Sequence, residues 1–298
     1  MLIKDIGEFA LIERFKRKIK TDSSVIKGSG DDCAVLKLDK QNHQLFTCDM
    51  LVEGVDFTLK DNSYLVGRKA IAVSLSDIAS CSGKPRHCVI SLGLPKNTSL
   101  SFVDKLFQGM LDIAKKYKVN IVGGDLSRSS KVVLDVSMLG EVEKKYLTLR
   151  SGARVGDIIF ITGELGGSIS GKHLQFTPRI KEARFLSRNF KVKAMTDISD
   201  GLTSDLGHIL EQSNAGAVIY EALIPLSGKA RNLSDALNNG EDFELLFTLS
   251  RPQALKLLKR KLSIFRPIGE IRERKYGFQL IDKRSRPVNI KPKGFKHF

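Results

Sequence analysis

A glycine-punctuated break near residue 150, LRSGARVGDIIFITGELGGS, constrains the fold of this chain more than any other feature. Strand-like and helix-like segments lie on both sides of the break, and they do not alternate strictly. This order favours α+β layering in each half over a doubly wound parallel sheet. We therefore predict two α/β domains, residues 1–148 and 149–298, and the 42% hydrophobic content is enough to give each a core.

Apolar spacing and turn signals predict the elements within each domain. Helices are expected over 8–19, 63–83, 101–119, 181–189, 201–214 and 252–262. Strands are expected over 33–38, 44–50, 88–94, 120–126, 131–142, 157–163, 215–222 and 243–250, followed by a strand-rich end.

Aspartates recur where predicted strands end or helices begin: Asp31, Asp32, Asp49, Asp77, Asp125, Asp197 and Asp200. Any one of them could serve only as a helix cap or a turn residue. Asp77 fits that interpretation least, because it lies within the apolar helix segment AVSLSDIAS and burial of an unpaired charge is costly. Many carboxylates without clustered His or Cys suit Mg²⁺ rather than zinc, and Mg²⁺ sites of this kind usually serve phosphates.

The net charge of +16 raises the alternative of nucleic-acid binding. The excess is densest in the last 50 residues and forms no recognisable DNA- or RNA-binding motif, and a basic surface also attracts ATP. No apolar stretch is long enough to span a membrane, and no signal peptide is evident. Four cysteines without a CxxC pair are typical of a cytoplasmic chain with reduced thiols.

Ten segments, in this order, resemble the thiamine-monophosphate kinase family, which belongs to the superfamily of aminoimidazole ribonucleotide synthetase and selenophosphate synthetase. They are GEFALIERF, GSGDDCAVL, TCDMLVEGVDF, AIAVSLSDIASCSGKP, IVGGDLSRS, LTLRSGARVGD, ITGELGGSISG, MTDISDGLTSDLGHI, NNGEDFELLFT and PKGFKHF. The motifs GDD, SLSDIA and GGD recur across the superfamily. The combination of DISDGL, GEDFELLFT and GFKHF points to the thiamine kinase branch.

The resemblance implies an N-terminal domain whose strands join those of a second copy in a barrel across a homodimer, with ATP bound between domains. Carried over residue by residue, the Mg²⁺ positions are Asp32, Thr47, Asp49, Asp77, Asp125, Asp197 and Asp200. The ATP contacts are Tyr117, Gly124, Asp125, Arg150 and Ser199, and the thiamine-side positions are Asp56, Glu241 and Phe295. The implied reaction moves the γ-phosphate of ATP to thiamine monophosphate. Its acceptor is already anionic at neutral pH, so no catalytic general base is expected.

The sequence departs from the family at four places. Asp56 replaces a frequent His, Cys48 replaces a Thr, and Phe295 replaces a Tyr or Trp. The segment between Gly171 and Pro178 is shorter than in typical members, which implies a trimmed lid.

Two alternatives remain open at this point. GGSISGKH, residues 166–173, follows a predicted strand and misses the P-loop signature by one residue, because His173 stands where Ser or Thr would bind Mg²⁺. A P-loop NTPase is therefore the second hypothesis. A non-catalytic nucleic-acid-binding protein is the third, and it predicts salt-sensitive binding without ATP turnover.

Overall fold

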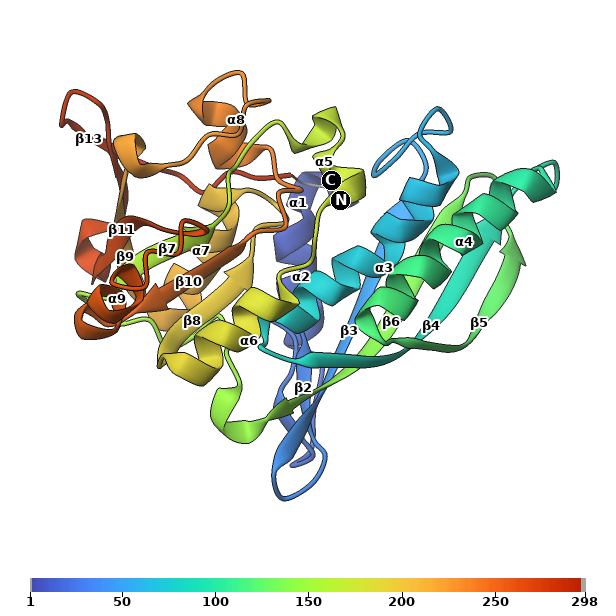
Figure 1. Ribbon diagram of the computed structural model, residues 1–298, viewed down its shortest axis with the longest axis horizontal. Helices are drawn as coiled ribbons and strands as arrows, with labels where there is room; N and C mark the ends of the chain where they lie inside the picture. Colours follow the sequence, from blue (N-terminus) through green and yellow to red (C-terminus); the bar gives the residue numbers. More distant parts are fainter. Residues whose placement is uncertain (1, 296–298) are drawn as a thin grey trace.

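The computed structural model describes residues 2–295 of the chain, apart from the side chains of Lys4 and Phe9, and contains two sheets (Figure 1). The first sheet has the strand order β1-β2-β3-β6-β4-β5. Its strands are β1 (Val25–Lys27), β2 (Ala34–Lys37), β3 (Asn42–Val52), β4 (Lys84–Leu94), β5 (Asn120–Arg128) and β6 (Val133–Glu143). All neighbouring pairs in this sheet are antiparallel except β4 with β5.

Two long helices, α3 (Ser63–Ser80) and α4 (Leu100–Tyr117), cover one face of the first sheet (Figure 1). They lie backbone to backbone because Gly67 and Gly109 have no side chains. A Cβ on Gly67 would come within 1.8 Å of the Leu106 carbonyl oxygen, and one on Gly109 within 1.9 Å of the Tyr64 oxygen. Helix α3 also packs against β3 and β6, and Asp77 lies in its last turn.

The opposite face of the first sheet carries no helix within the described residues. Alternate side chains of the strands point to this face, and among them Phe46, Met50 and Val89 are between 41% and 57% exposed. The edge strand β5 also exposes Val122 and Leu126. Large exposed apolar surfaces of this kind mark interaction sites.

The second sheet has the order β13-β12-β9-β11-β7-β10-β8. Its strands are β7 (Ile158–Thr162), β8 (Val192–Asp197), β9 (Ala215–Tyr220), β10 (Leu245–Leu249), β11 (Phe265–Glu273), β12 (Phe278–Ile281) and β13 (Pro287–Asn289). The helices of this half are α5 (Lys172–Gln175), α6 (Ile180–Asn189), α7 (Leu202–Ser213), α8 (Leu233–Asn238) and α9 (Arg251–Leu258). Helices α1 (Ile3–Ile6) and α2 (Glu8–Lys16) precede the first sheet.

Both faces of the second sheet are packed. Ile159 and Ile161 of β7 share a core with α7, whereas Phe160, between them, faces the core that extends into the first domain through α6. The two domains are therefore joined by a continuous apolar core rather than by a solvated linker.

The α+β architecture expected from the sequence is confirmed, and the predicted elements are present with ends that differ by a few residues. The helix expected over 8–19 ends at Lys16, and β8 was not anticipated because KVKAMTD mixes charges into a short apolar run. The proposed boundary at 148/149 falls in the connection between β6 and β7. No helix within residues 2–295 is long and apolar enough to cross a membrane.

Candidate functional site

Three predicted metal ligands from distant parts of the chain meet beneath α3. Asp32 precedes β2, Asp77 lies on α3 and Asp197 ends β8, and one oxygen from each lies within 4.8 Å of the others. Asp32 and Asp77 come from the first domain and Asp197 from the second, so the junction of the two domains creates this acidic cluster.

Hydroxyl groups hold the carboxylates around the cluster. Ser74 of α3 donates to Asp49 of β3 at 2.8 Å, and Ser76 of the same helix donates to Asp197. The hydroxyl of Thr47 donates to Asp77, so its oxygen lies beside the cluster. Each hydroxyl orients a carboxylate without neutralising its charge.

One cation borders the cluster. Arg150 donates from Nε to Asp32 Oδ1 at 3.0 Å, and Thr196 donates to the same oxygen at 2.9 Å. The other oxygen of Asp32, Oδ2, is buried and has no hydrogen-bond partner among the described residues. Buried polar atoms are almost always satisfied, so this orphan oxygen indicates a ligand position.

Crowding of carboxylates disturbs their protonation. Burial, together with the charges of Asp135 and Asp32, raises the pKa of Asp49 to about 6. Burial and the charge of Asp32 raise the pKa of Asp197 to about 7, and burial raises the pKa of Asp77 well above its usual range. These carboxylates therefore repel one another, and a bound cation would relieve that repulsion.

The donor set fits Mg²⁺. Carboxylate and hydroxyl oxygens surround an orphan carboxylate oxygen, and neither His nor Cys belongs to the Asp32–Asp77–Asp197 group. Cys48, whose residue type differs from the family, points to the uncovered face of the sheet, where its thiol donates to Asp135 at 3.2 Å.

Asp200 belongs to a neighbouring group. Its carboxylate lies within 4.8 Å of ligand atoms of Asp205 and His208 on α7. Burial lowers the pKa of His208 to about 4, with Arg150 adding to the effect, so this imidazole is neutral at physiological pH. Asp205 and His208 were not predicted as site residues; their positions three and six residues after Leu202, where DISDGL ends and α7 begins, were the available signal.

Two cavities flank the acidic residues, and Asp200 lines both. The smaller, of about 210 Å³, is lined by Asp49 and Asp200 and by all three predicted thiamine-side residues: Asp56, Glu241 and Phe295. Ser199 also lines it. The larger, of about 620 Å³, lies between α2 and α7 and is lined by Arg150, Lys16 and His208.

Three predicted residues lie apart from this site. Asp125 and Gly124 are on β5, and Tyr117 ends α4, where its hydroxyl donates to the Pro178 carbonyl at 3.4 Å. In the sheet register Asp125 lies beside Ser91, Asp135 and Met50, whereas Asp49 points to the other face. Three strand steps of about 4.8 Å separate β5 from β3, so within one chain Asp125 lies about 14 Å across the sheet from Asp49.

The P-loop-like segment 166–173 forms a different structure. Its residues make a 3₁₀ turn and the start of the short helix α5 rather than a loop leading into a long helix. Lys172 Nζ contacts Glu244 Oε1 and the Glu164 carbonyl, each at 3.0 Å. The lysine is thus engaged by the protein, and the P-loop hypothesis is not favoured.

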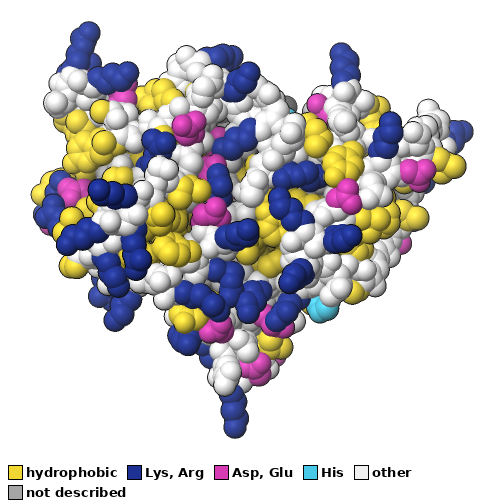
Figure 2. Space-filling view, in the orientation of Figure 1, with side chains coloured by type: hydrophobic (Ala, Val, Ile, Leu, Met, Phe, Trp, Pro, Cys, Tyr) yellow, Lys and Arg dark blue, Asp and Glu magenta, His cyan; other side chains and the backbone are white. Residues whose placement is uncertain are grey.

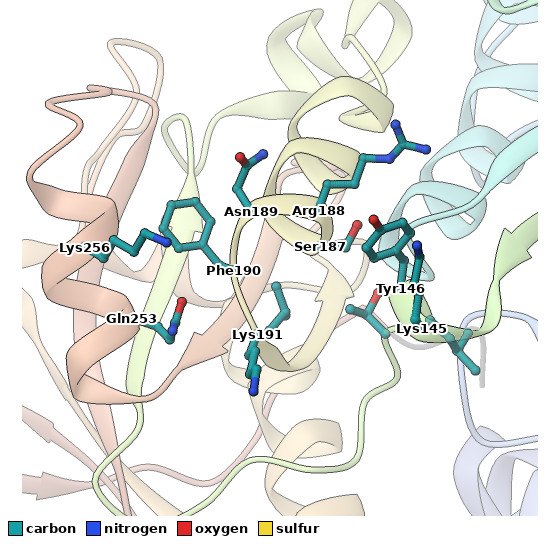
Figure 3. Close-up of a pocket in the computed structure, with 12 residues that line it drawn as sticks. Lys145, Tyr146, Ser187, Arg188, Asn189, Phe190, Lys191, Gln253 and Lys256 are labelled. Atoms are coloured by element: carbon teal, nitrogen blue, oxygen red, sulfur yellow. The ribbon is translucent and has the colours of Figure 1, made fainter.

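A further cavity, of about 560 Å³, lies between α6, α9 and the connection after β6 (Figure 3). Lysine and arginine side chains also gather over this face of the molecule (Figure 2). The lining includes Lys145, Arg188, Lys191 and Lys256 and no described acidic residue, so it cannot be a cation site.

Sequence reasoning missed Ser74, Ser76 and Lys69 on α3. Their signal in the sequence is the same as that of Asp77: a polar side chain within an otherwise apolar helix.

Comparisons with known proteins show which chains and folds this one is similar to. The family model for the N-terminal domain of AIR synthase related protein matches residues 30–142, and the model for the C-terminal domain matches residues 154–281. Thiamine-monophosphate kinase of Buchnera aphidicola is 36% identical over 98% of both chains, and that of Bacillus subtilis is 32% identical over 98% of this chain and all of its own length. The solved structure of AaThiL complexed with AMPPCP and TMP superposes with a TM-score of 0.87 at 30% identity, covering all of this chain and 99% of the other.

Proposed function

The chain belongs to the thiamine-monophosphate kinase family, and we propose that it transfers the γ-phosphate of ATP to thiamine monophosphate, giving thiamine diphosphate and ADP. The observation that carries this proposal is a full-length match to kinases of this name, combined with two neighbouring cavities that share Asp200 and are lined in addition by Asp49 or by Asp31. An enzyme that transfers a phosphoryl group between two phosphate-bearing substrates needs two neighbouring cavities of this kind.

We propose that several Mg²⁺ ions are held by Asp32, Thr47, Asp49, Asp77, Asp197 and Asp200. The orphan oxygen of Asp32 and the raised pKa values of Asp49 and Asp197 support this assignment. Bound Mg²⁺ would supply the positive charge that two anionic phosphates need in order to approach each other.

We propose that thiamine monophosphate binds in the 210 Å³ cavity and ATP in the 620 Å³ cavity. Asp56, Glu241 and Phe295 line the first, together with Asp49 and Asp200. Arg150 and Lys16 line the second beside the carboxylates of Glu8, Glu13, Asp31, Asp200 and Glu211, so a triphosphate there would need bound Mg²⁺ as well as these two cations. Ser199 lines the smaller cavity next to Asp200, and its contact with ATP stays a prediction.

The chemistry asks the protein for positioning rather than for covalent catalysis. The acceptor phosphate needs no general base, and we assign no such role to any residue. Arg150 keeps its charge because Asp32, Asp205 and Asp31 offset its burial and raise its pKa. Transfer is direct and in line, without a phosphoenzyme.

We propose further that the active form is a homodimer joined through the uncovered face of the first sheet. The exposed apolar side chains of Phe46, Met50 and Val89 support this interface. Because Asp125 and Gly124 lie on the strand at its edge, they would act in the partner's site rather than in their own. The role of Tyr117 rests on the resemblance alone.

Mixing two inactive variants tests the shared site. If Asp125 acts across the interface, Asp49→Asn and Asp125→Asn chains that exchange subunits form one intact site per mixed dimer and regain activity. Mixed dimers that stay inactive, although subunit exchange is demonstrated, would show that both residues act within one chain.

A product assay tests the function itself. With Mg²⁺-ATP and thiamine monophosphate the protein should form thiamine diphosphate, and free thiamine should be a poor acceptor because it lacks the phosphate. Efficient phosphorylation of free thiamine would contradict the proposal. The domain boundary at 148/149 and the cytoplasmic location stay predictions.

A further inference from the structure

A lysine is completely buried beside the proposed thiamine-side cavity. Lys69, on α3, has 0% exposure and is the largest fully buried side chain among the described residues. Lysine is almost never fully buried unless its charge is paired. The reaction described above assigns it no role.

Lys69 contacts three segments, two of which, at Asp56 and Glu241, contribute to the cavity wall. Its ammonium donates to the Asp56 carbonyl oxygen at 2.9 Å and to Glu241 Oε1, and it lies 3.5 Å from His173 Nδ1. Asp56 belongs to the first domain, whereas His173 and Glu241 belong to the second. Two of the three proposed thiamine-side residues are therefore fixed by this one lysine.

The Glu241 carboxylate is held at both of its oxygens. Lys69 contacts Oε1, and His173 Nδ1 lies 3.3 Å from Oε2. The backbone of Glu241 is left-handed, with φ of 56°, and its N–H donates to the Ser199 carbonyl at 2.7 Å. A non-glycine residue in this conformation needs support from its surroundings.

The ion pair changes what Glu241 can offer a ligand. Its negative charge is balanced by Lys69, so it is a weak counter-ion for the cationic thiazolium ring. A carboxylate has about four lone-pair positions, and the lysine and the histidine use only part of them. The rest remain available to accept hydrogen bonds from a neutral donor.

We propose that Lys69 is a positioning residue of the substrate cavity: it balances the charge of Glu241 and, with His173, orients that carboxylate as a hydrogen-bond acceptor for a neutral N–H donor on the substrate. This inference rests on the proposed function, and the amino group of the pyrimidine ring of thiamine monophosphate is a donor of this class.

The variant Lys69→Met separates this proposal from a counter-ion role of Glu241. If Glu241 acts through its charge, removal of the lysine exposes that charge to the thiazolium and lowers KM for thiamine monophosphate. If Lys69 positions Glu241, the same change raises that KM at least tenfold, with kcat within threefold and KM for ATP within twofold of wild type.

Steady-state kinetics of the full-length protein decide between them, with Lys105→Met as the matched control because Lys105 is an exposed lysine on the neighbouring helix α4. An unchanged or lower KM for thiamine monophosphate, or a loss confined to kcat, would overturn the proposal. A wild-type protein that forms no thiamine diphosphate would instead overturn the proposed function.

Lys69→Met leaves Glu241 partly buried without its cation, and this variant could fail to fold. The double variant Lys69→Met/Glu241→Gln removes both charges and keeps a carbonyl acceptor at the same place. It should fold and, because the charge imbalance is gone and His173 still lies beside position 241, its KM for thiamine monophosphate should be lower than that of Lys69→Met. A folded double variant with a larger KM would contradict the acceptor role.

Discussion

Two groups of buried acidic residues in this molecule differ in how they are neutralised. Glu244 and Asp242, beneath the segment 166–173, are matched within the chain: Arg179 donates to both oxygens of Glu244 at 2.7 and 2.8 Å, Thr162 adds a hydroxyl, and Asp242 accepts the Gly166 N–H at 3.0 Å. Carboxylates satisfied in this way stabilise structure.

The Asp32–Asp77–Asp197 cluster is not neutralised and hydrogen-bonded by the chain to the same extent. Arg150 is its bordering cation, and Asp32 Oδ2 has no partner among the described residues. The lesson is that burial and acidity do not by themselves identify a site. A site is indicated where the chain gathers more negative charge than its own cations offset.

The largest expected effect comes from the unmatched cluster. Asp49→Asn, or Asp77→Asn, should reduce kcat/KM at least about 10³-fold, equivalent to about 4 kcal/mol, because each removes a charge that a shared Mg²⁺ needs. Far-UV circular dichroism should show the fold intact. Near-normal turnover in both variants would place these residues with the structural carboxylates.

The pH dependence of stability sharpens the comparison. The pKa of Asp197 is raised from 3.8 to about 7, so the native protein binds more protons than the unfolded chain between these values and loses stability as pH rises. Asp197→Asn should therefore gain stability relative to wild type from pH 4 to 7, by up to about 1.4 kcal/mol per pH unit. Urea unfolding with EDTA measures the difference, and a difference that does not vary with pH would contradict the raised pKa.

The smallest effect on activity is expected from a substitution beside Glu244 and Asp242. Lys172 contacts Glu244 and Asp242 rather than a phosphate site, so Lys172→Ala should lower kcat/KM by at most about tenfold, or about 1.4 kcal/mol. A P-loop lysine would be indispensable. An inactive Lys172→Ala beside an active Asp49→Asn would reverse the assignment of both regions.

Part of this site could be predicted from the sequence, and part depends on long-range strand pairing. Asp77 was singled out because no partner for it was visible nearby, and the structure brings it to Asp32 and Asp197. The placement of Asp125 could not be foreseen, because it depends on the order of strands in the sheet and on which face each residue meets. Those properties come from long-range pairing rather than from local pattern.

Lys69 is a second residue whose role could not be predicted from the sequence. Its helix segment, KAIAVSLSD, contains two charged residues, Lys69 and Asp77, and only Asp77 was predicted to belong to the site. The partner of Lys69 is 172 residues away, on a loop held in a left-handed conformation. Such a pair is set by the docking of two domains.

The most direct measurement is the dependence of unfolding free energy on Mg²⁺ at pH 8 for wild type, Asp77→Asn and Glu244→Gln. A ligand at a hundred times its Kd stabilises the native state by about 2.7 kcal/mol. Wild type and Glu244→Gln should gain stability equally from Mg²⁺, although Glu244→Gln begins less stable, and Asp77→Asn should gain much less. An equal gain in Asp77→Asn, or a gain lost in Glu244→Gln, would contradict the claim that the unmatched cluster binds the metal.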